Sequence, residues 1–117
     1  MNIQDLKQLY RRTVTKISDN STAVRLRLDP VDPKTLRVLT HVTIENRTTA
    51  YTKCRLGIKN GATDHYLDEL TTVAAGELAV SRSDILLGEG DVLFAKLTGT
   101  TSGDFLVMTC IGWEMDL

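Results

Sequence analysis

Apolar and polar residues alternate along most of this chain, and the alternation is clearest in residues 105–117. In a strand, residues of one parity share one face of the sheet. The odd parity of this segment is largely apolar and comprises Phe105, Val107, Ile111, Trp113 and Met115. The even parity is apolar over its first half, through Leu106, Met108 and Cys110. The segment therefore predicts a central strand packed on both sides, and we assign Phe105 and Trp113 to the core.

Similar alternation recurs upstream. It predicts a strand at residues 23–28, another at residues 36–45 with Leu36, Val38, Val42 and Ile44 on one face, and a third at residues 51–58. Turn signals, such as Asn60-Gly61, separate these segments at intervals of roughly eight to fifteen residues. No helical pattern lies between them. This spacing indicates an all-β protein, an antiparallel β-sandwich that is jelly-roll-like or immunoglobulin-like.

The N-terminal segment follows a different period. Its apolar residues recur at intervals of three and four, which predicts a short amphipathic helix over residues 2–12. Residues 13–17 alternate like a strand, and their structure is left open. The residues of the helical stripe that we expect to contact a partner or another copy are Ile3, Leu6, Leu9 and Tyr10.

Two prolines, Pro30 and Pro33, form a stiff connector that cannot donate to a strand ladder. The sequence therefore divides into a helix and arm, residues 1–35, and a β-sandwich body, residues 36–117. On this division, deletion of residues 1–22 leaves a folded monomer that no longer assembles.

Length and charge narrow the function. A chain of 117 residues is one domain by size. A net charge of -1 predicts no general attraction to nucleic acid or to an anionic membrane. No run approaches the roughly 20 apolar residues of a membrane span, and the charged N-terminus does not resemble a signal peptide, so we expect synthesis to be intracellular.

Candidate chemistry is sparse. Cys54 and Cys110 sit within apolar strand patterns and are expected to be buried thiols, with a disulfide between neighbouring strands as the alternative. The alternation places Cys54 in the core and His41 on the outside, so they do not form a nucleophile pair. His65 lies near a hairpin. We therefore expect no catalytic residues, no metal site and no cofactor, and we do not expect an enzyme.

Sugar binding requires exposed aromatic platforms. The chain has six aromatic residues, of which Phe105 and Trp113 are assigned to the core. At most Tyr51 and Tyr66 could serve as platforms, and they are a weak alternative ligand platform.

Several short motifs follow one another in a fixed order within residues 36–117. They are Val42-Thr-Ile-Glu-Asn46, Cys54-Arg-Leu-Gly-Ile58, Val73-Ala-Ala-Gly76, Ile85-Leu-Leu-Gly-Glu-Gly-Asp-Val-Leu93 and Ile111-Gly-Trp-Glu114. Their order resembles that of small β-sandwich virion proteins of tailed bacteriophages, which decorate the capsid or form the head–tail neck. The resemblance implies a non-enzymatic virion component, made in the bacterial host cytoplasm, that assembles in several copies.

Its partners would be copies of itself and other virion proteins of the capsid, portal or tail. The alternative is a carbohydrate-binding or receptor-binding β-sandwich module of a phage or bacterium. The sequence leaves open the position in the virion, the symmetry and the copy number.

Overall fold

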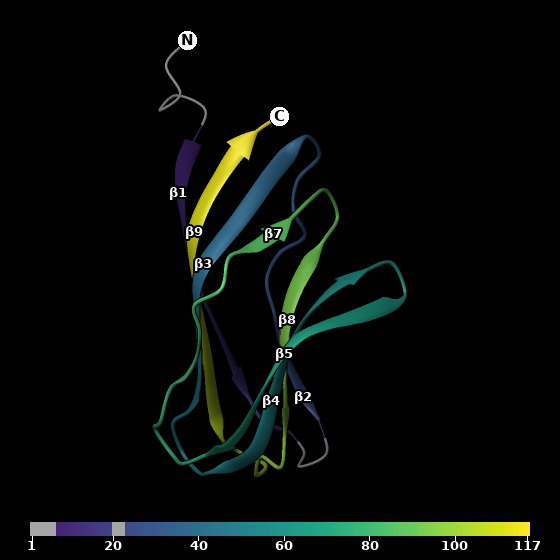
Figure 1. Cartoon of the computed structure of the whole chain (residues 1–117). Helices are drawn as coiled ribbons and strands as arrows, with labels where there is room; N and C mark the ends of the chain where they lie inside the picture. The colour runs from purple at the N-terminus through teal and green to yellow at the C-terminus, as the bar shows by residue number, and fades with distance from the viewer. Residues whose placement is uncertain (1–6, 20–22) are drawn as a thin grey trace.

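The computed structural model describes residues 7–19 and 23–117, and these residues form nine β-strands and no helix. Figure 1 shows the strands as two layers that face one another. The strands are β1 (Lys7–Ile17), β2 (Val24–Arg27), β3 (Thr35–Asn46), β4 (Tyr51–Asn60), β5 (Thr63–Val73), β6 (Ala79–Ser81), β7 (Ile85–Leu87), β8 (Val92–Thr98) and β9 (Phe105–Asp116). The prediction of an all-β protein with two packed antiparallel sheets is confirmed.

The two layers mix early and late strands of the chain. One sheet has the order β1-β9-β3, and its fourth position is shared by β6 and β7, which pair with different halves of β3. The other sheet has the order β2-β8-β4-β5. All pairings are antiparallel. The β4–β5 hairpin bends away from the rest of the sandwich (Figure 1), and its turn contains Gly61 at φ 70°, which confirms the predicted turn.

The predicted N-terminal helix is wrong for residues 7–12, which begin strand β1, while residues 2–6 lie outside the described residues. β1 pairs with β9 over its whole length, from Lys7 opposite Met115 to Ile17 opposite Phe105. The β-branched residues of its second half favour an extended chain. In its first half, pairing with the edge of β9 stabilises the same conformation. Residues 7–17 and 24–27 of the predicted arm are therefore strands of the two sheets.

The core lies between the two sheets. Its buried apolar residues come from both layers and include Tyr10, Leu39, Val42, Ile44, Leu106, Met108 and Cys110 from the five-stranded sheet and Val24, Leu26, Cys54, Leu56, Leu93, Ala95 and Leu97 from the other. Leu28 and Val31, in the proline-containing connector, fill the space between the layers at one end.

The assignment of faces in β9 and β3 differs from the prediction. In β9 the even residues Leu106, Met108 and Cys110 face the core, so the odd residues, Phe105 and Trp113 included, lie on the outer side of the sheet. In β3 the pairing shifts between Leu39 and His41. This β-bulge reverses the parity, so Val42 and Ile44 face the core while Leu36 and Val38 face outward.

A buried carboxylate joins the turns at one end of the sandwich. Asp104 is 1% exposed, and its Oδ2 accepts hydrogen bonds from Asn46 Nδ2 (2.7 Å), Thr49 Oγ1 (2.6 Å) and the Thr101 amide (2.7 Å). Its carbonyl accepts a hydrogen bond from the amide of Ser18. The polar side chain thereby ties the β3–β4 turn, the β8–β9 turn and the end of β1 together.

Candidate interaction surfaces

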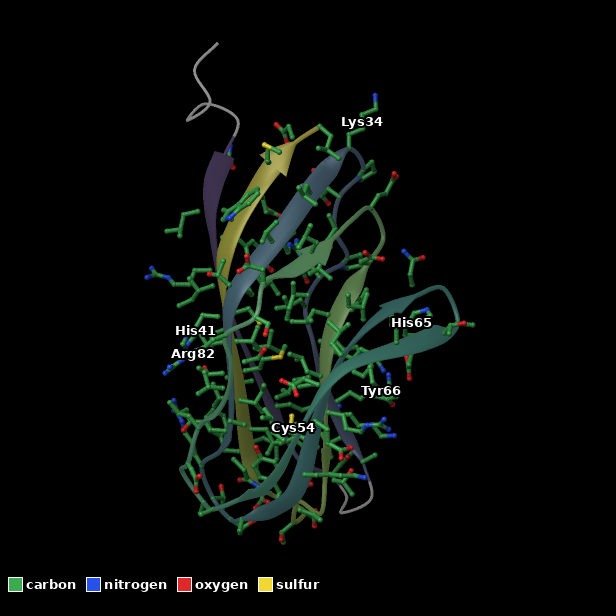
Figure 2. All side chains as sticks on the ribbon, in the orientation of Figure 1. Lys34, His41, Cys54, His65, Tyr66 and Arg82 are labelled. Atoms are coloured by element: carbon green, nitrogen blue, oxygen red, sulfur yellow. The ribbon has the colours of Figure 1, made fainter. Side chains whose placement is uncertain are left out.

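The side chains that could take part in a reaction lie apart from one another. His41 lies on the outer side of β3 opposite Ile111, His65 is exposed on β5, and Cys54 is buried between the sheets. Figure 2 shows the two histidines on opposite sides of the molecule, with Cys54 between them. Among the described residues there is no pocket and no group of three or more His, Cys, Asp or Glu side chains that could hold a metal ion. Nor does the described part of the chain contain a helix long and apolar enough to cross a membrane.

Both cysteines are free and fully buried. Cys54 belongs to the four-stranded sheet and Cys110 to the five-stranded sheet. Burial raises the pKa of each thiol to about 12. Since the thiolate is the reactive form, both side chains act as small apolar core residues at neutral pH.

Of the two tyrosines proposed as a ligand platform, Tyr51 is buried and Tyr66 is half-buried. Tyr51 is 4% exposed and belongs to the core, so its ring has no open face for a sugar. Tyr66 is half-buried on the outer side of β5, where its ring packs edge-on against Phe94 at 5.7 Å between centroids. The Arg55 guanidinium lies 3.7 Å above the Tyr66 ring.

The four residues of the proposed N-terminal contact stripe do not form one surface in the described structure. Ile3 and Leu6 lie outside the described residues. Leu9 is 76% exposed, whereas Tyr10 is 6% exposed and faces the core. The physical reason is the strand conformation, which places consecutive residues on opposite faces.

Leu9 instead belongs to an apolar row that crosses the outer side of the five-stranded sheet. The register places Leu9 of β1 opposite Trp113 of β9, Trp113 opposite Val38 of β3, and Val38 opposite Leu86 of β7. Directly paired residues share a face, so these four side chains lie side by side. Leu9 and Leu86, at the two ends, are 76% and 63% exposed, whereas Trp113 is partly exposed and Val38 is only 5% exposed.

Neighbouring rows extend this surface along β9. One adjacent row contains Met115 and Leu36, while the other places Ile111 between the charged Arg11 and the polar His41, and further along Glu45 pairs with Val107. At the far end lie Phe105 and Ile17, the latter 57% exposed. The outer side of this sheet is hereafter called the apolar face, and its apolar members are Leu9, Ile17, Leu36, Val38, Leu86, Phe105, Val107, Ile111, Trp113 and Met115.

A row of threonines crosses the middle of the apolar face. Thr13, Thr109 and Thr43 pair in register, and the hydroxyl oxygens of Thr13 and Thr109 are 3.3 Å apart. Threonine suits a strand because it is β-branched, and its hydroxyl group can bond to water. This row therefore interrupts the apolar surface with polar, uncharged side chains. The sequence indicated that such a face exists, because residues of both parities in β9 are apolar. The pattern does not show which parity faces the core.

The outer side of the four-stranded sheet is different in character, because it is basic. The register places Arg25 of β2 opposite Lys96 of β8, and Lys96 opposite Arg55 of β4. Arg27, Lys53 and Lys59 lie two or four residues from this row and so share its face. This surface is hereafter called the basic face, and its cations are Arg25, Arg27, Lys53, Arg55, Lys59 and Lys96.

Two carboxylates lie on the basic face. Asp64 accepts hydrogen bonds from both terminal nitrogens of Arg25, at 3.2 Å and 2.5 Å, and these bonds, together with nearby cations, hold the pKa of its carboxyl below the usual value. Glu69 lies 3.2 Å from Arg55 Nε and 3.9 Å from Lys53 Nζ.

Comparison with known proteins supports the fold but no family. No protein-family model matches the chain, and no curated protein matches it. A chain in the acidic stable capsid structure of Helicobacter pylori bacteriophage KHP30 is similar over 96% of this chain and 100% of its own, with a TM-score of 0.51 and 15% identity. The K3 cleaved adhesin domain of Lys-gingipain from Porphyromonas gingivalis is similar over 89% and 74%, with a TM-score of 0.51 and 12% identity.

A protein of Bacteroides thetaiotaomicron assigned as an alpha-L-fucosidase is similar over 85% of this chain, with a TM-score of 0.55 and 8% identity. The chain spans only 22% of that protein. At these identities the likeness concerns the fold alone. The chain is therefore an antiparallel two-sheet β protein, and the comparisons support no more than this fold.

Proposed function

We propose that this chain is a non-enzymatic structural protein that assembles in several copies through its apolar face. The observation that carries the proposal is the row Leu9–Trp113–Val38–Leu86 on the outer side of a sheet whose inner side already forms the core. A monomeric soluble protein rarely exposes a contiguous apolar surface of more than a few hundred Å². The apolar surface of another copy would shield this one from water.

The dimensions of the apolar face suit such a contact. Along β9 it runs from Phe105 to Met115, ten residue steps or about 33 Å at about 3.3 Å per residue. Four strand positions at about 4.8 Å give a width of about 19 Å, so the flat area of this whole side of the sheet, its polar and charged residues included, is about 600 Å². A standard protein interface buries about 800 Å² on each partner, which is the same order.

We propose the virion of a tailed bacteriophage as the setting, on the capsid or at the head–tail neck, with copies of the chain and other virion proteins as partners. The order of motifs in residues 36–117 supports this setting. The fold shared with a chain of the phage KHP30 capsid is compatible with it. A carbohydrate-binding or receptor-binding module is the competing function; the buried ring of Tyr51 and the Tyr66 ring occupied by Arg55 give it little support.

The test is the oligomeric mass of the purified protein. Replacement of Leu9 and Leu86 by lysine places two charges on the apolar face without touching the core. We expect the wild type to be an oligomer and this double variant to be a monomer of unchanged circular dichroism.

Leu67 and Leu78 provide the matched control, since they are 50% and 52% exposed and belong to neither sheet's row of apolar residues. Their replacement by lysine is expected to leave the oligomer intact. A monomeric wild type, or equal loss of the oligomer in the control, would rule out assembly through the apolar face.

A further inference from the structure

The basic face concentrates charge in a chain that is nearly neutral overall. Among the described residues, it holds six of the fourteen Lys and Arg residues but only two of the fourteen Asp and Glu residues. The other described residues consequently include eight basic and twelve acidic side chains. The described structure therefore concentrates positive charge on one face and leaves the remainder net acidic.

The central row of the basic face is unfavourable for an isolated molecule. Lys96 lies directly between Arg25 and Arg55, so two like-charged pairs sit at opposed positions of neighbouring strands. Like charges at such positions destabilise a sheet. Asp64 and Glu69 relieve the two ends of the row, but none of the ion pairs among the described residues includes Lys96, Arg27 or Lys59.

Aromatic rings hold the arginines of this row in place. The Arg25 guanidinium lies 4.5 Å from the centroid of the Phe94 ring, and the Arg55 guanidinium lies 3.7 Å from that of Tyr66. Phe94 in turn lies against Gly57, where a Cβ would approach the ring to 2.8 Å. Guanidinium groups fixed in this way lose little further freedom when they bind an anion.

The anion that these groups already bind is a carboxylate. Asp64 and Glu69 are both bound by the arginines of the row, and Arg25 binds Asp64 through two nitrogens. A partner that supplies further carboxylates to the centre of the row continues the pairing that the chain itself begins.

A surface with such carboxylates adjoins the end of the basic face at Lys59, which lies opposite Val92. The loop with Asp29 and Asp32 and the loop with Glu89 and Asp91 are joined by hydrogen bonds from the Val31 amide to the Asp91 carbonyl and from the Gly90 amide to the Val31 carbonyl. These four residues are hereafter called the acidic end.

Asp29 of this group pairs with Arg12, and Asp91 accepts a hydrogen bond from Asn60. Asp32 and Glu89 are exposed, and neither side chain takes part in an ion pair or hydrogen bond among the described residues. They are therefore the two carboxylates of the acidic end that are open to a partner.

We propose that the basic face of one copy binds the acidic end of a second copy, so that copies join head to tail in addition to their contact through the apolar face. The inference rests on the proposed function in that it names a second contact of the same assembly. A head-to-tail contact joins two different surfaces, so it generates rings or extended arrays and not closed pairs.

The test exchanges charges between the two surfaces. One variant carries Arg27→Glu and Lys96→Glu, and the other carries Asp32→Lys and Glu89→Lys. Each variant alone opposes like charges at the contact, so we expect its salt-dependent association constant to fall about tenfold or more. When the two variants are mixed, opposite charges meet again at both surfaces, and association returns.

Matched controls separate a specific contact from general charge attraction. Lys16→Glu with Arg82→Glu, and Glu77→Lys with Asp84→Lys, change the net charge by the same amounts at exposed positions outside the two surfaces. Sedimentation velocity of each protein and of each mixture is measured at about 0.05 M and about 0.5 M salt, where screening is weak and strong respectively. The control variants are expected to associate as the wild type does.

The outcomes distinguish this inference from the proposed function. A salt-insensitive oligomer that is lost with Leu9→Lys and Leu86→Lys, but is unaffected by the charge variants, overturns only the head-to-tail contact. Loss of association in the control variants as large as in the test variants also overturns it. So does a wild type that stays monomeric at low salt and binds a short oligonucleotide through Arg27 and Lys96, because the partner is then a polyanion. A protein that never associates overturns both proposals.

Discussion

The buried carboxylate of Asp104 allows the most detailed prediction about stability. Replacement by alanine leaves the buried Asn46 Nδ2 without its acceptor. The partly buried Thr49 Oγ1 keeps the Ala50 carbonyl at 3.3 Å, and the amide of Thr101, an exposed residue, can bind water. A buried donor left unpaired costs about 1–3 kcal/mol. We therefore expect Asp104→Ala to lower the free energy of unfolding by about 2–3 kcal/mol, out of the roughly 5–15 kcal/mol of a typical domain.

Asparagine keeps an acceptor oxygen but removes the charge. Hydrogen bonds to a charged group contribute about 1.5–3 kcal/mol and those between neutral groups about 0.5–1.5 kcal/mol, while burial of a neutral amide costs less than burial of a carboxylate. The expected loss for Asp104→Asn is therefore about 1–2 kcal/mol. Asp84→Asn, at an exposed position, is the control and is expected to change stability by less than about 0.5 kcal/mol.

The same carboxylate gives a pH dependence whose sign follows from its environment. Burial raises the pKa of Asp104, but the hydrogen bonds from Thr49, Asn46 and Thr101 outweigh burial and hold it below the ordinary value. The carboxylate thus contributes stability at neutral pH, and this contribution disappears as the pH falls below the unfolded-state pKa, about 3.9, through the lower folded-state pKa.

Urea unfolding followed by the fluorescence of the single tryptophan, from pH 7 to pH 3, measures both effects. The difference in unfolding free energy between the wild type and Asp104→Asn is expected to be largest near neutral pH and to narrow below about pH 4. A difference that equals that of Asp84→Asn, or that stays constant down to pH 3, would refute the role given to the ionised carboxylate.

Further predictions concern the core and the strand edges. Cys54 and Cys110 are expected to resist a thiol reagent at pH 8 in the native protein, because burial raises their pKa to about 12, and to react fully in denaturant; fast reaction of the native protein would show that the core is open. Gly57→Ala should cost about 1–3 kcal/mol, because its Cβ would approach Phe94 to 2.8 Å, whereas Gly88→Ala, with its nearest atom at 3.9 Å, serves as the control in the same denaturation assay. Deletion of residues 1–22 removes β1 from the edge of β9, so we now expect loss of cooperative unfolding; a stable, folded truncated protein would contradict this.

The local pattern predicted the sandwich but not the assignment of its faces. Turn residues such as Gly61 and the alternation of residues 24–28 identified strands because both depend on local conformation. In β9 both parities are apolar, so alternation alone cannot tell the core side from the outer side. In β3 the bulge near Thr40 reverses the parity, and no feature of the sequence marked it.

The N-terminal strand and the basic face depend on distant partners. The spacing of Leu9, Tyr10 and Val14 fits a helix, but pairing with β9 imposes a strand over residues 7–17. The row of Arg25, Lys96 and Arg55 exists only because β2, β8 and β4 are neighbours, and the order of strands in a sheet is not encoded in any single segment.

The central claim, that the apolar face is covered by another copy, is tested most directly at Trp113. This residue is the only tryptophan of the chain and lies in the middle of the apolar row. Acrylamide quenching of its fluorescence is measured over a dilution series in which the oligomeric mass is followed in parallel. The quenching constant is expected to fall as the oligomer forms, and to stay high at all concentrations when Leu9 and Leu86 are replaced by lysine. An oligomer that forms while the quenching of Trp113 does not change would show that the copies meet elsewhere.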